Sequence, residues 1–509
     1  MQSPPKESVL LDTADYIVIG AGSSGCVIAN RLSADPSVRV LVIEAGASGE
    51  EDASVTAPGR WTSLIGSQYD WTYVTEPEPG LLQRQVATPR GKVHGGSSAV
   101  NAMVHIRGHR GCFDAWRAQG NPGWGYDDLL PLFKRSECND GGASEYRGAN
   151  GPLAVSRCLD PHASHEAFLS AANELGFRAD RHYDFNVPEP VGVAGFYQRN
   201  ILNGRRHSAA AAFLAPAMAR PNVEVRSRCH VVRVSFEGRR ATGVEYLCDG
   251  AVTRVRAERE VVLCAGAIDS PRLLMLSGIG RADDLRALGI AVVADLPGVG
   301  SNLQDHLKLS VRWKARTTLP GSSVTAGLFT SSDSTSPPNL QFYVGRGLDQ
   351  QEAVVTITAS LVRPESRGSV TLGSANPLSA PVLQANYLHA AADAAALIHG
   401  ARLARECGMS RAYDELRLDE TEPGVDMKSD NDLERFAREK ADTIYHLAGT
   451  CRMGPVSDPA AVVDGSLKVH GVERLRVADA SIMPEVVNAP THAACVVIGE
   501  KCATLISGR

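Results

Sequence analysis

The sequence predicts an α/β fold because two segments each join a β-branched strand to a helix, and a later region alternates apolar and polar residues in short strands. The first segment covers residues 15–44, the second covers residues 261–280, and the alternating strands follow residue 306. The chain has 509 residues, of which 43% are hydrophobic, so it can bury more than one large core. This composition excludes a disordered or fibrous protein.

The first strand, residues 15–20, ends on a glycine-rich turn, GAGSSG, that opens a helical pattern. In such a turn Gly20 makes the sharp bend, Gly22 lets the backbone approach a pyrophosphate, and Gly25 lets the helix pack close to the strand. The second strand ends at Glu44, whose carboxylate can accept hydrogen bonds from both ribose hydroxyls and would repel a 2′-phosphate. The motif therefore predicts a site for NAD or FAD rather than NADP, with the phosphates at the helix N-terminus.

A second glycine cluster, TPRGKVHGGSSAVN, occupies residues 88–101. Its Gly95 and Gly96 permit close backbone approach to a flat ligand. An ordinary NAD enzyme does not need a second glycine cluster of this kind, so the cluster favours FAD. Residues 261–280, VVLCAGAIDSPRLLMLSGIG, predict a strand followed by a helix that Pro271 opens, because proline is common in a first helical turn.

Charge and cysteine content limit the function classes. The 52 basic and 57 acidic residues are mixed along the chain, so no basic stripe is available and nucleic-acid binding is not expected. The 11 cysteines are scattered without a CxxC pair, which predicts reduced, mostly buried thiols in a cytoplasmic protein and no disulfide framework. No signal peptide, membrane span or metal site is predicted. His105 and His109 lie four residues apart but lack the glutamate of a zinc motif.

Three blocks resemble the glucose-methanol-choline (GMC) oxidoreductases, which are FAD-dependent alcohol oxidases and dehydrogenases. Residues 91–101 are similar to the first family signature, except that His94 stands where an aliphatic residue is usual, and residues 266–280 fit the second signature. Three C-terminal segments are similar to the third family landmark: YHLAGTCRMG at residues 445–454, LRVADASIMP at 475–484 and NAPTHAACVVIGEK at 488–501.

The resemblance implies an α/β (α+β) architecture, in which an antiparallel-sheet substrate domain is inserted into a Rossmann-type FAD-binding domain. The FAD-binding domain is predicted to comprise residues 1–158, 200–305 and 441–509, and the substrate domain residues 159–199 and 306–440. The alternating runs in the insert are typical of half-buried strands, whereas residues 317–338 form a polar, turn-rich stretch. Residues 390–407 predict a helix, and the alanine-rich residues 208–219 predict a core helix.

The glycine motifs and the resemblance together assign the FAD-binding residues. They are Gly20, Gly22, Ser23, Ser24, Gly25, Glu44, Ala45, Arg90, Gly95, Gly96, Ser97, Asn101, Ala102, Met103, Val104, Val231, Ala265, Gly266, Asp479, Ala480, Pro490 and Thr491. By resemblance, Asp479 lies near the ribityl or phosphate region of FAD, and the helix that starts near Thr491 points its positive end at the pyrimidine edge of the flavin. Relatives with covalent FAD carry a histidine where this chain has Val100, so non-covalent FAD is predicted.

Oxidising an alcohol by hydride transfer requires a base at the hydroxyl group and an electron acceptor facing the C–H bond. His446 matches the catalytic histidine of the family and is predicted to be the general base. The family places a second histidine or asparagine 44 residues later, where this chain has Pro490, which has no side-chain donor or acceptor. His492 is the nearest candidate to supply the lost function, or it packs beside the flavin without taking part in catalysis.

Proline at the second catalytic position resembles the pyridoxine 4-oxidases of this family, which favours a primary alcohol on an aromatic or heteroaromatic ring. Choline or an aliphatic alcohol is the alternative, but aromatic residues make up only 6% of the chain, which disfavours an aromatic cage for a quaternary ammonium. A flavin-containing hydroxynitrile lyase, an NAD dehydrogenase and a non-catalytic binding protein are the other classes considered. The predicted partners are a small alcohol and O₂ or another electron acceptor, and the predicted state is a monomer or small homo-oligomer.

Overall fold

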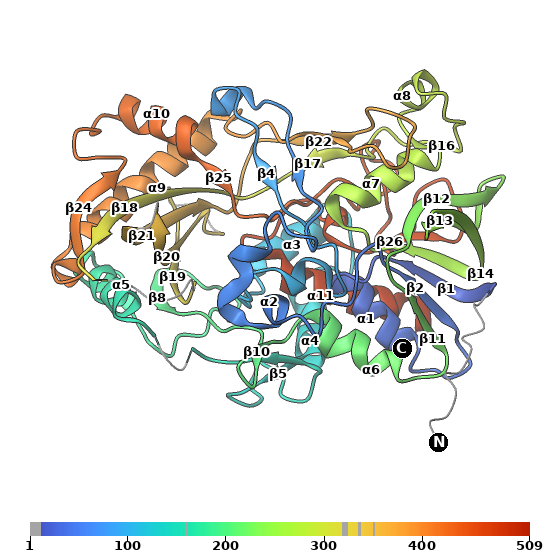
Figure 1. Cartoon of the computed structure of the whole chain (residues 1–509), viewed down its shortest axis with the longest axis horizontal. Helices are drawn as coiled ribbons and strands as arrows, with labels where there is room; N and C mark the ends of the chain where they lie inside the picture. Colours follow the sequence, from blue (N-terminus) through green and yellow to red (C-terminus); the bar gives the residue numbers. More distant parts are fainter. Residues whose placement is uncertain (1–11, 159–160, 318–323, 334–336, 350–351, 509) are drawn as a thin grey trace.

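The computed structural model describes residues 12–158, 161–317, 324–333, 337–349 and 352–508. Its two large sheets lie toward opposite ends of the molecule, with helices α1 and α11 between them (Figure 1). A separate hydrophobic core surrounds each sheet. The predicted α/β fold, with a Rossmann-type unit and a second sheet, is therefore confirmed.

The first sheet has the strand order β11-β2-β1-β14-β13-β12, and β26 pairs with the C-terminal end of β14. Strands β11, β2, β1, β14 and β26 run parallel, whereas β12, β13 and β14 form an antiparallel meander. These strands are β1 (Thr13–Ile19), β2 (Val40–Ile43), β11 (Val223–Arg226), β12 (His230–Glu237), β13 (Arg240–Cys248), β14 (Ala251–Leu263) and β26 (Leu475–Val477). Helix α1 (Ser23–Leu32) joins β1 to β2, as the glycine motif predicts.

Helix α7 (Gly266–Leu276) follows β14 and starts five residues before the predicted proline. Pro271 lies inside this helix and cannot donate a hydrogen bond to the carbonyl oxygen of Ala267. The hydroxyl of Thr450 donates to that oxygen instead, at 2.6 Å. The prediction that Pro271 opens the helix is therefore wrong. The helix can begin before the proline because Thr450, which is distant in sequence, donates to the Ala267 carbonyl oxygen that Pro271 cannot reach with an N–H.

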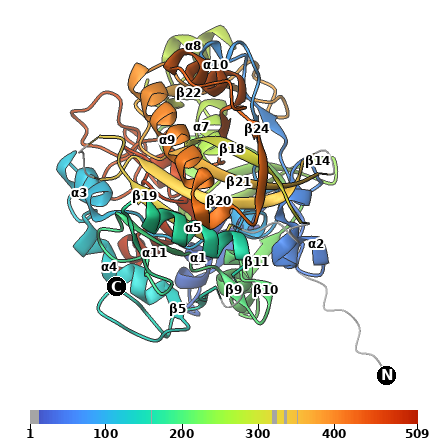
Figure 2. The same ribbon diagram turned by 90° about the vertical axis from the view of Figure 1, so that its left-hand side faces the viewer.

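The second sheet has the order β24-β18-β21-β20-β19-β8-β7, with β25 also beside β18, and only its β7–β8 pair is parallel. Its strands are β7 (Arg178–Ala179), β8 (Val193–Phe196), β18 (Leu307–Ala315), β19 (Ala326–Thr330), β20 (Leu340–Asp349), β21 (Glu352–Leu361), β24 (Arg417–Glu422) and β25 (Asp442–Thr443). Helix α9 (Ala391–Met409), predicted from residues 390–407, packs across β18, β20 and β21 (Figure 2).

The turn-rich stretch predicted at residues 317–338 contains strand β19, which the sequence pattern missed. Gly327 lies in this strand against the Tyr197 ring, and small residues of this kind obscure the alternation. Residues 318–323 and 334–336 of the stretch lie outside the described residues. The predicted helix at 208–219 is present as a π-helical turn, η4 (Ala210–Leu214), followed by α6 (Ala215–Met218).

Shorter elements connect the two sheets. The helical ones are α2 (Ala53–Thr56), η1 (Pro58–Leu64), η2 (Pro79–Leu81), η3 (Gly96–Ala99), α3 (Arg110–Ala118), α4 (Tyr126–Ser136), α5 (Ala163–Glu174), α8 (Ala282–Ala287), η5 (Arg411–Tyr413), α10 (Asp430–Lys440), η6 (Ala480–Ile482) and α11 (Thr491–Ser507). The strands are β3 (Tyr73–Val74), β4 (Ala87–Thr88), β5 (Glu137–Asn139), β6 (Leu153–Val155), β9 (Ile201–Leu202), β10 (Arg205–Arg206), β15 (Ile279–Gly280), β16 (Ala294–Asp295), β17 (Ser301–Leu303), β22 (Gly368–Thr371) and β23 (Val382–Gln384).

Helices α1 and α11 pack directly against each other although they lie far apart in sequence. The Ser24 hydroxyl donates to the carbonyl oxygen of Cys495 at 2.7 Å, and Arg31 forms an ion pair with the fully buried Glu500, also at 2.7 Å. Within the described part of the chain, no helix is both long and apolar enough to cross a membrane. The same residues contain no cluster of three or more histidine, cysteine or acidic side chains suited to a metal ion.

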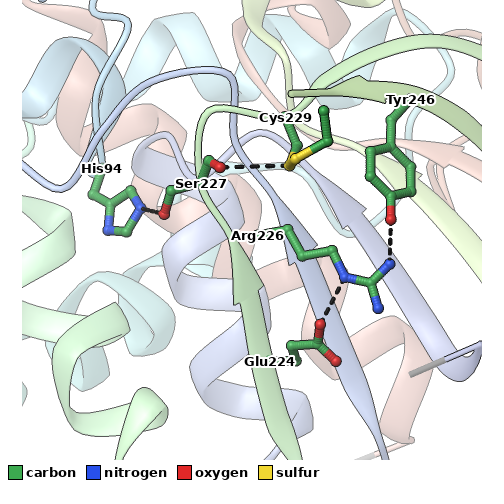
Figure 3. The surroundings of a disulfide bond; sticks show 7 residues. His94, Glu224, Arg226, Ser227, Cys229 and Tyr246 are labelled. Carbon is green, nitrogen blue, oxygen red and sulfur yellow. Dashed lines mark hydrogen bonds and ion pairs between the residues drawn. A yellow bond between two sulfur atoms is a disulfide. The ribbon is translucent and has the colours of Figure 1, made fainter. Parts of the chain in front are cut away.

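One disulfide joins Cys229, just before β12, to Cys248 at the end of β13 (Figure 3). The two strands are antiparallel, and the pairing of His230 with Leu247 places the cysteines opposite each other, 4.5 Å apart at Cα. The prediction of reduced thiols is therefore wrong for this pair, because register across a hairpin, and not a CxxC spacing, brings the two sulfur atoms together. The neighbouring His94, which departs from the usual signature residue, contacts the Ser227 hydroxyl at 2.7 Å.

Candidate active site

A cavity of about 480 Å³ lies between the two sheets and is lined by residues from Ile19 to Cys495. Of the residues predicted to bind the cofactor or act in catalysis, all except Gly25 and Gly95 line this cavity. The structure therefore brings together segments from both ends of the chain and from the insert.

The glycine-rich turn between β1 and α1 forms one end of the cavity. A side chain at Gly22 would meet only one neighbouring atom, the carbonyl oxygen of Cys264 at 3.7 Å, so the space beside it is open toward the cavity. At Gly25, by contrast, a Cβ atom would lie 2.0 Å from the carbonyl oxygen of Gly20. Gly22 thus leaves room for a ligand, and Gly25 permits the tight turn itself.

The second glycine cluster packs on this turn. The backbone N–H of Gly95 donates to the carbonyl oxygen of Ala21 at 2.7 Å, and a Cβ at Gly96 would lie 2.8 Å from the Cα of Gly22. Gly96 lines the cavity, whereas Gly95 does not. The close approach predicted at these glycines is therefore made partly to the backbone of the first motif.

Glu44 lies at the end of β2, where the sequence predicts a ribose-binding carboxylate. Its two oxygens accept hydrogen bonds from the N–H groups of Ala21 and Gly46, each at 2.8 Å. Burial raises the pKa of Glu44 to about 7, although these two hydrogen bonds oppose the shift. Each oxygen keeps a lone pair for a ligand hydroxyl, so the site fits the ribose of a dinucleotide.

The cavity wall contains buried polar atoms that point to a polar ligand. The Nε and Nη2 atoms of Arg90 are buried without hydrogen-bond partners among the described residues, while its Nη1 donates to the Tyr445 carbonyl oxygen at 2.7 Å. Asp479 accepts from the Gly266 N–H at 2.9 Å and from the Ser270 hydroxyl at 2.5 Å. Together with the open space at Gly22, these groups fit a dinucleotide bound in an extended form.

His446 lies between the cofactor end of the cavity and the second sheet. Its Nδ1 is 3.0 Å from the Nδ1 of His306, the residue that precedes β18, and the two rings are nearly perpendicular. Burial lowers the pKa of His446 well below its usual value, and the neighbouring His306 and Arg90 lower it further. Burial also lowers the pKa of His306, to about 3. Both imidazoles are therefore neutral at pH 7, and only one Nδ1 of the pair carries a proton.

A hydrogen-bond network around Asp305 fixes the loop that carries His446. One oxygen of Asp305 accepts from the His446 N–H at 2.8 Å, and the other accepts from the hydroxyls of Tyr387 and Thr443. Tyr445 has a φ of 69°, a left-handed conformation that is unusual for a large residue. Its N–H donates to the Thr443 hydroxyl at 2.7 Å, and its carbonyl oxygen binds Arg90, so both of its backbone polar groups are held.

His492 occupies the first turn of α11, after Pro490, which caps the helix. Its Nδ1 is 2.9 Å from the hydroxyl of Ser23 in the glycine-rich turn. Burial lowers the pKa of His492 to about 3, and its Nε2 is buried with no hydrogen-bond partner among the residues that the structure describes. One ring nitrogen is thus engaged on the cofactor side of the cavity, and the assignment of Pro490 and His492 as catalytic stays a prediction.

The sequence prediction did not include His306, Asp305 or Lys308. The pair Asp305-His306 was visible as the start of the insert, but nothing in the linear pattern shows that it faces His446, 140 residues later. Lys308 lines the cavity from strand β18, and only the three-dimensional position of that strand shows that its side chain faces the cavity.

The chain matches the GMC oxidoreductase family model, with the N-terminal part over residues 14–308 and the C-terminal part over residues 364–499. It is 41% identical to the mitochondrial choline dehydrogenase of Mus musculus, over 98% of this chain and 90% of that protein. It is 39% identical to the oxygen-dependent choline dehydrogenase of Brucella melitensis, over 97% of this chain and 96% of that protein.

Solved structures with the same fold include enzymes that act on other alcohols. The pyridoxine 4-oxidase from Mesorbium loti superposes with a TM-score of 0.92 at 32% identity, covering 98% of this chain and 100% of that one. A fungal aryl-alcohol oxidase superposes with a TM-score of 0.86 at 26% identity, covering 98% of this chain and 99% of that one.

Proposed function

The chain belongs to the GMC oxidoreductase family of FAD-dependent enzymes acting on CH–OH donors, and we propose that it oxidises a primary alcohol on an aromatic or heteroaromatic ring to the aldehyde. The observation that carries this proposal is the neutral His446 imidazole, held by His306 in the same cavity as the cofactor-binding residues. Proline at position 490 and the likeness to the pyridoxine 4-oxidase and aryl-alcohol oxidase structures support an aromatic substrate.

When bound, FAD supplies the acceptor for the hydride that leaves the alcohol carbon. His446 takes the hydroxyl proton at Nε2, which requires its own proton to sit on Nδ1. That Nδ1–H then donates to the Nδ1 of His306, 3.0 Å away, and His306 carries its proton on Nε2. With the protons placed in this way, His306 accepts from His446 and orients its ring so that Nε2 is free to take the proton.

The buried site stabilises the neutral base before the reaction. Because burial, His306 and Arg90 all lower the pKa of His446, the ring gives up the abstracted proton readily when the reaction is complete. The Asp305 network keeps the loop fixed, so the Nε2 atom does not have to be ordered during each turnover.

On the cofactor side, we assign His492 a positioning role. Its hydrogen bond with Ser23 connects the first turn of α11 to the phosphate-binding turn of α1. The family's second hydrogen-bonding residue is replaced by Pro490, so in this proposal His446 handles the substrate hydroxyl alone. Non-covalent FAD, reoxidation by O₂ or another acceptor, cytoplasmic localisation and a monomeric or small oligomeric state stay predictions from the sequence.

Choline is the second candidate substrate, and the sequence similarity to choline dehydrogenases favours it. The test is an anaerobic titration of the purified holoenzyme with pyridoxine, benzyl alcohol, choline and an aliphatic alcohol, with loss of the oxidised-flavin absorbance as the readout. We expect the aromatic alcohols to reduce the flavin fastest. Fast reduction by choline or the aliphatic alcohol alone would contradict the proposed substrate.

Two further measurements complete the test. Peroxide formation on admitting O₂ distinguishes an oxidase from a dehydrogenase that needs another acceptor. Acid precipitation is expected to release all the flavin into the supernatant, and yellow colour retained by the protein would show a covalent bond. If none of the four alcohols reduces the flavin, the proposed substrate class is wrong, and the lyase activity considered from the sequence becomes the next hypothesis.

A further inference from the structure

The face of strand β18 that lines the cavity is polar and carries two cations. Along the strand, Leu307, Leu309 and Val311 are buried in the core that includes α9, while the residues between them are partly exposed. Those residues, Lys308, Ser310 and Arg312, line the cavity. The alternation of a strand therefore separates an apolar face, packed under α9, from a polar face turned to the substrate space.

The same polar face continues across the neighbouring strands. Ser310 pairs with Thr358 of β21, which pairs in turn with Tyr343 of β20, and all three residues line the cavity. Gln341 of β20 also lines it. This wall offers hydroxyl and amide groups along with the two cations, so it fits a polar substrate.

The two cations line the cavity, whereas the carboxylates that pair with them do not. Lys308 has an ion pair with Asp442 at 3.2 Å, and Arg312 has one with Glu422 at 3.0 Å, but neither carboxylate lines the cavity. The acidic residues that do line it all lie outside the antiparallel sheet: they are Glu44, Asp70, Asp269 and Asp479. Both cations line the cavity, and each carboxylate partner lies beside its cation as the cross-strand neighbour on the same face of the sheet.

Lys308 lies close to the reacting centre. It lies two residues after His306, which contacts His446, and its Nζ atom lies over the ring of Tyr445, the residue before His446. Burial acts to lower the pKa of Lys308, but Tyr343 and Asp442 raise it above its ordinary value, so the ammonium group stays charged.

The ring of Tyr445, the residue that precedes His446, already has this ammonium group over one face. The Nζ atom of Lys308 lies 5.3 Å from the centre of the Tyr445 ring, a cation–π contact made by the protein itself. A quaternary ammonium group placed on this ring would have to displace Lys308, and it would share the cavity with two cations of β18.

We propose that the substrate alcohol carries a carboxylate, which binds the ammonium group of Lys308 while its hydroxyl faces His446. This inference rests on the proposed alcohol oxidation and specifies the substrate class of the same site. The ammonium group pairs with Asp442 at 3.2 Å, and it has three N–H donors, so it can also donate to a substrate carboxylate. It sets this chain apart from its choline dehydrogenase relatives, whose named substrate is a cation.

The test compares three alcohols that share one ring: 4-(hydroxymethyl)benzoate, benzyl alcohol and 4-(hydroxymethyl)phenyltrimethylammonium. The holoenzyme is mixed with each under anaerobic conditions, and the second-order rate constant of flavin reduction is measured. We expect the carboxylate to react at least tenfold faster than benzyl alcohol, and the trimethylammonium compound to react most slowly. Equal rates for the three, or a fastest rate for the cation, would overturn the proposal.

Two variants assign the preference to one side chain. Lys308→Gln is expected to bring the ratio of carboxylate to neutral substrate close to one, and using a ratio cancels any general loss of activity. Lys314→Gln, which removes the same charge from the exposed end of the same strand, is the control and is expected to keep the wild-type ratio. An unchanged ratio in Lys308→Gln would refute the assignment.

A binding measurement separates this inference from the proposed function. Benzoate and benzyltrimethylammonium are titrated into the oxidised holoenzyme, and the change in the flavin spectrum gives each dissociation constant without turnover. Tighter binding of benzoate, lost in Lys308→Gln, supports the anion site even if no alcohol proves to be a substrate. If alcohols reduce the flavin but benzoate binds no better than the cation, alcohol oxidation stands and the anion site is refuted.

Discussion

The two walls of the cavity are built in different ways. On the cofactor side, backbone atoms form much of the surface, at the turn of Gly20 and Gly22 and at Gly96. A Cβ atom at Gly96 would collide with the backbone of Gly22. On the substrate side, alternate side chains of β18, β20 and β21 make the surface, and Lys308 is the charged residue closest to His306 in the strand. A backbone wall is held by tight packing and suits one constant ligand. A side-chain wall can change its specificity by single substitutions without altering the fold.

The largest expected effect comes from the residue where the walls meet. His446→Ala should lower the rate of flavin reduction by about 10²–10⁴-fold, because a positioned base is removed. The bound flavin should remain, since the glycine turn and Glu44 are untouched. Anaerobic stopped-flow measurements on the flavin-loaded variant test this, and a rate within tenfold of wild type would show that His446 is not the base.

A substitution in the backbone wall should act on FAD and not on chemistry. Gly22→Val places a side chain in the open space beside the turn, and overpacking of this kind costs about 1–3 kcal/mol, or roughly 5–150-fold in the FAD dissociation constant. Gly59→Val serves as the control, because a side chain at Gly59 has no neighbour within 4 Å and this residue does not line the cavity. Flavin fluorescence titration of the apoprotein measures both, and equal FAD affinity in the two variants would contradict the assignment of the turn.

A smaller effect is expected at the residue that orients the base. His306→Leu removes the acceptor for the His446 Nδ1–H and should lower the rate of flavin reduction by about tenfold. His306→Asn keeps an oxygen acceptor and is expected to restore part of the loss. No recovery in the asparagine variant, with both proteins folded and flavin-loaded, would show that His306 only packs there.

The pH profile separates orientation from packing at the same position. A base works when neutral, and the pKa of His446 lies well below 6.5, so wild-type kcat/KM should stay level through pH 6.5 and fall only in more acidic solution. His306 contributes to this lowering, so in His306→Leu the acid limb should move to higher pH. An acid limb at the same pH in both proteins would contradict the electrostatic coupling.

Sequence reasoning was most successful where the structure depends on local backbone requirements. The turn at Gly20, Gly22 and Gly25, the carboxylate of Glu44 and the helix that begins after Pro490 all lie where the motifs placed them. Each follows from short spacings that a strand, a turn and a helix impose on the chain.

It was least successful where two segments that are distant in sequence bind each other, through a hydrogen bond or a disulfide. The start of α7 was misplaced because Thr450 satisfies the carbonyl left by Pro271, and the disulfide was missed because Cys229 and Cys248 meet only across a hairpin. The site prediction did not include His306 and Lys308 for the same reason, because their roles depend on the three-dimensional position of the loop that carries His446. Linear spacing contains no information about such partners.

The packing of α11 on α1 also determines when this part of the structure can form during synthesis of the chain. The glycine-rich turn leads into α1 at Ser23, but the Ser23–His492 contact and the Ser24–Cys495 hydrogen bond need residues that lie 469 and 471 positions later in the chain. At about 5–20 residues per second, a ribosome spends roughly half a minute to a minute and a half between these two segments. The contact between α1 and α11 therefore forms only after this interval, during which the side of α1 that α11 covers is exposed, and transiently exposed apolar surface favours aggregation.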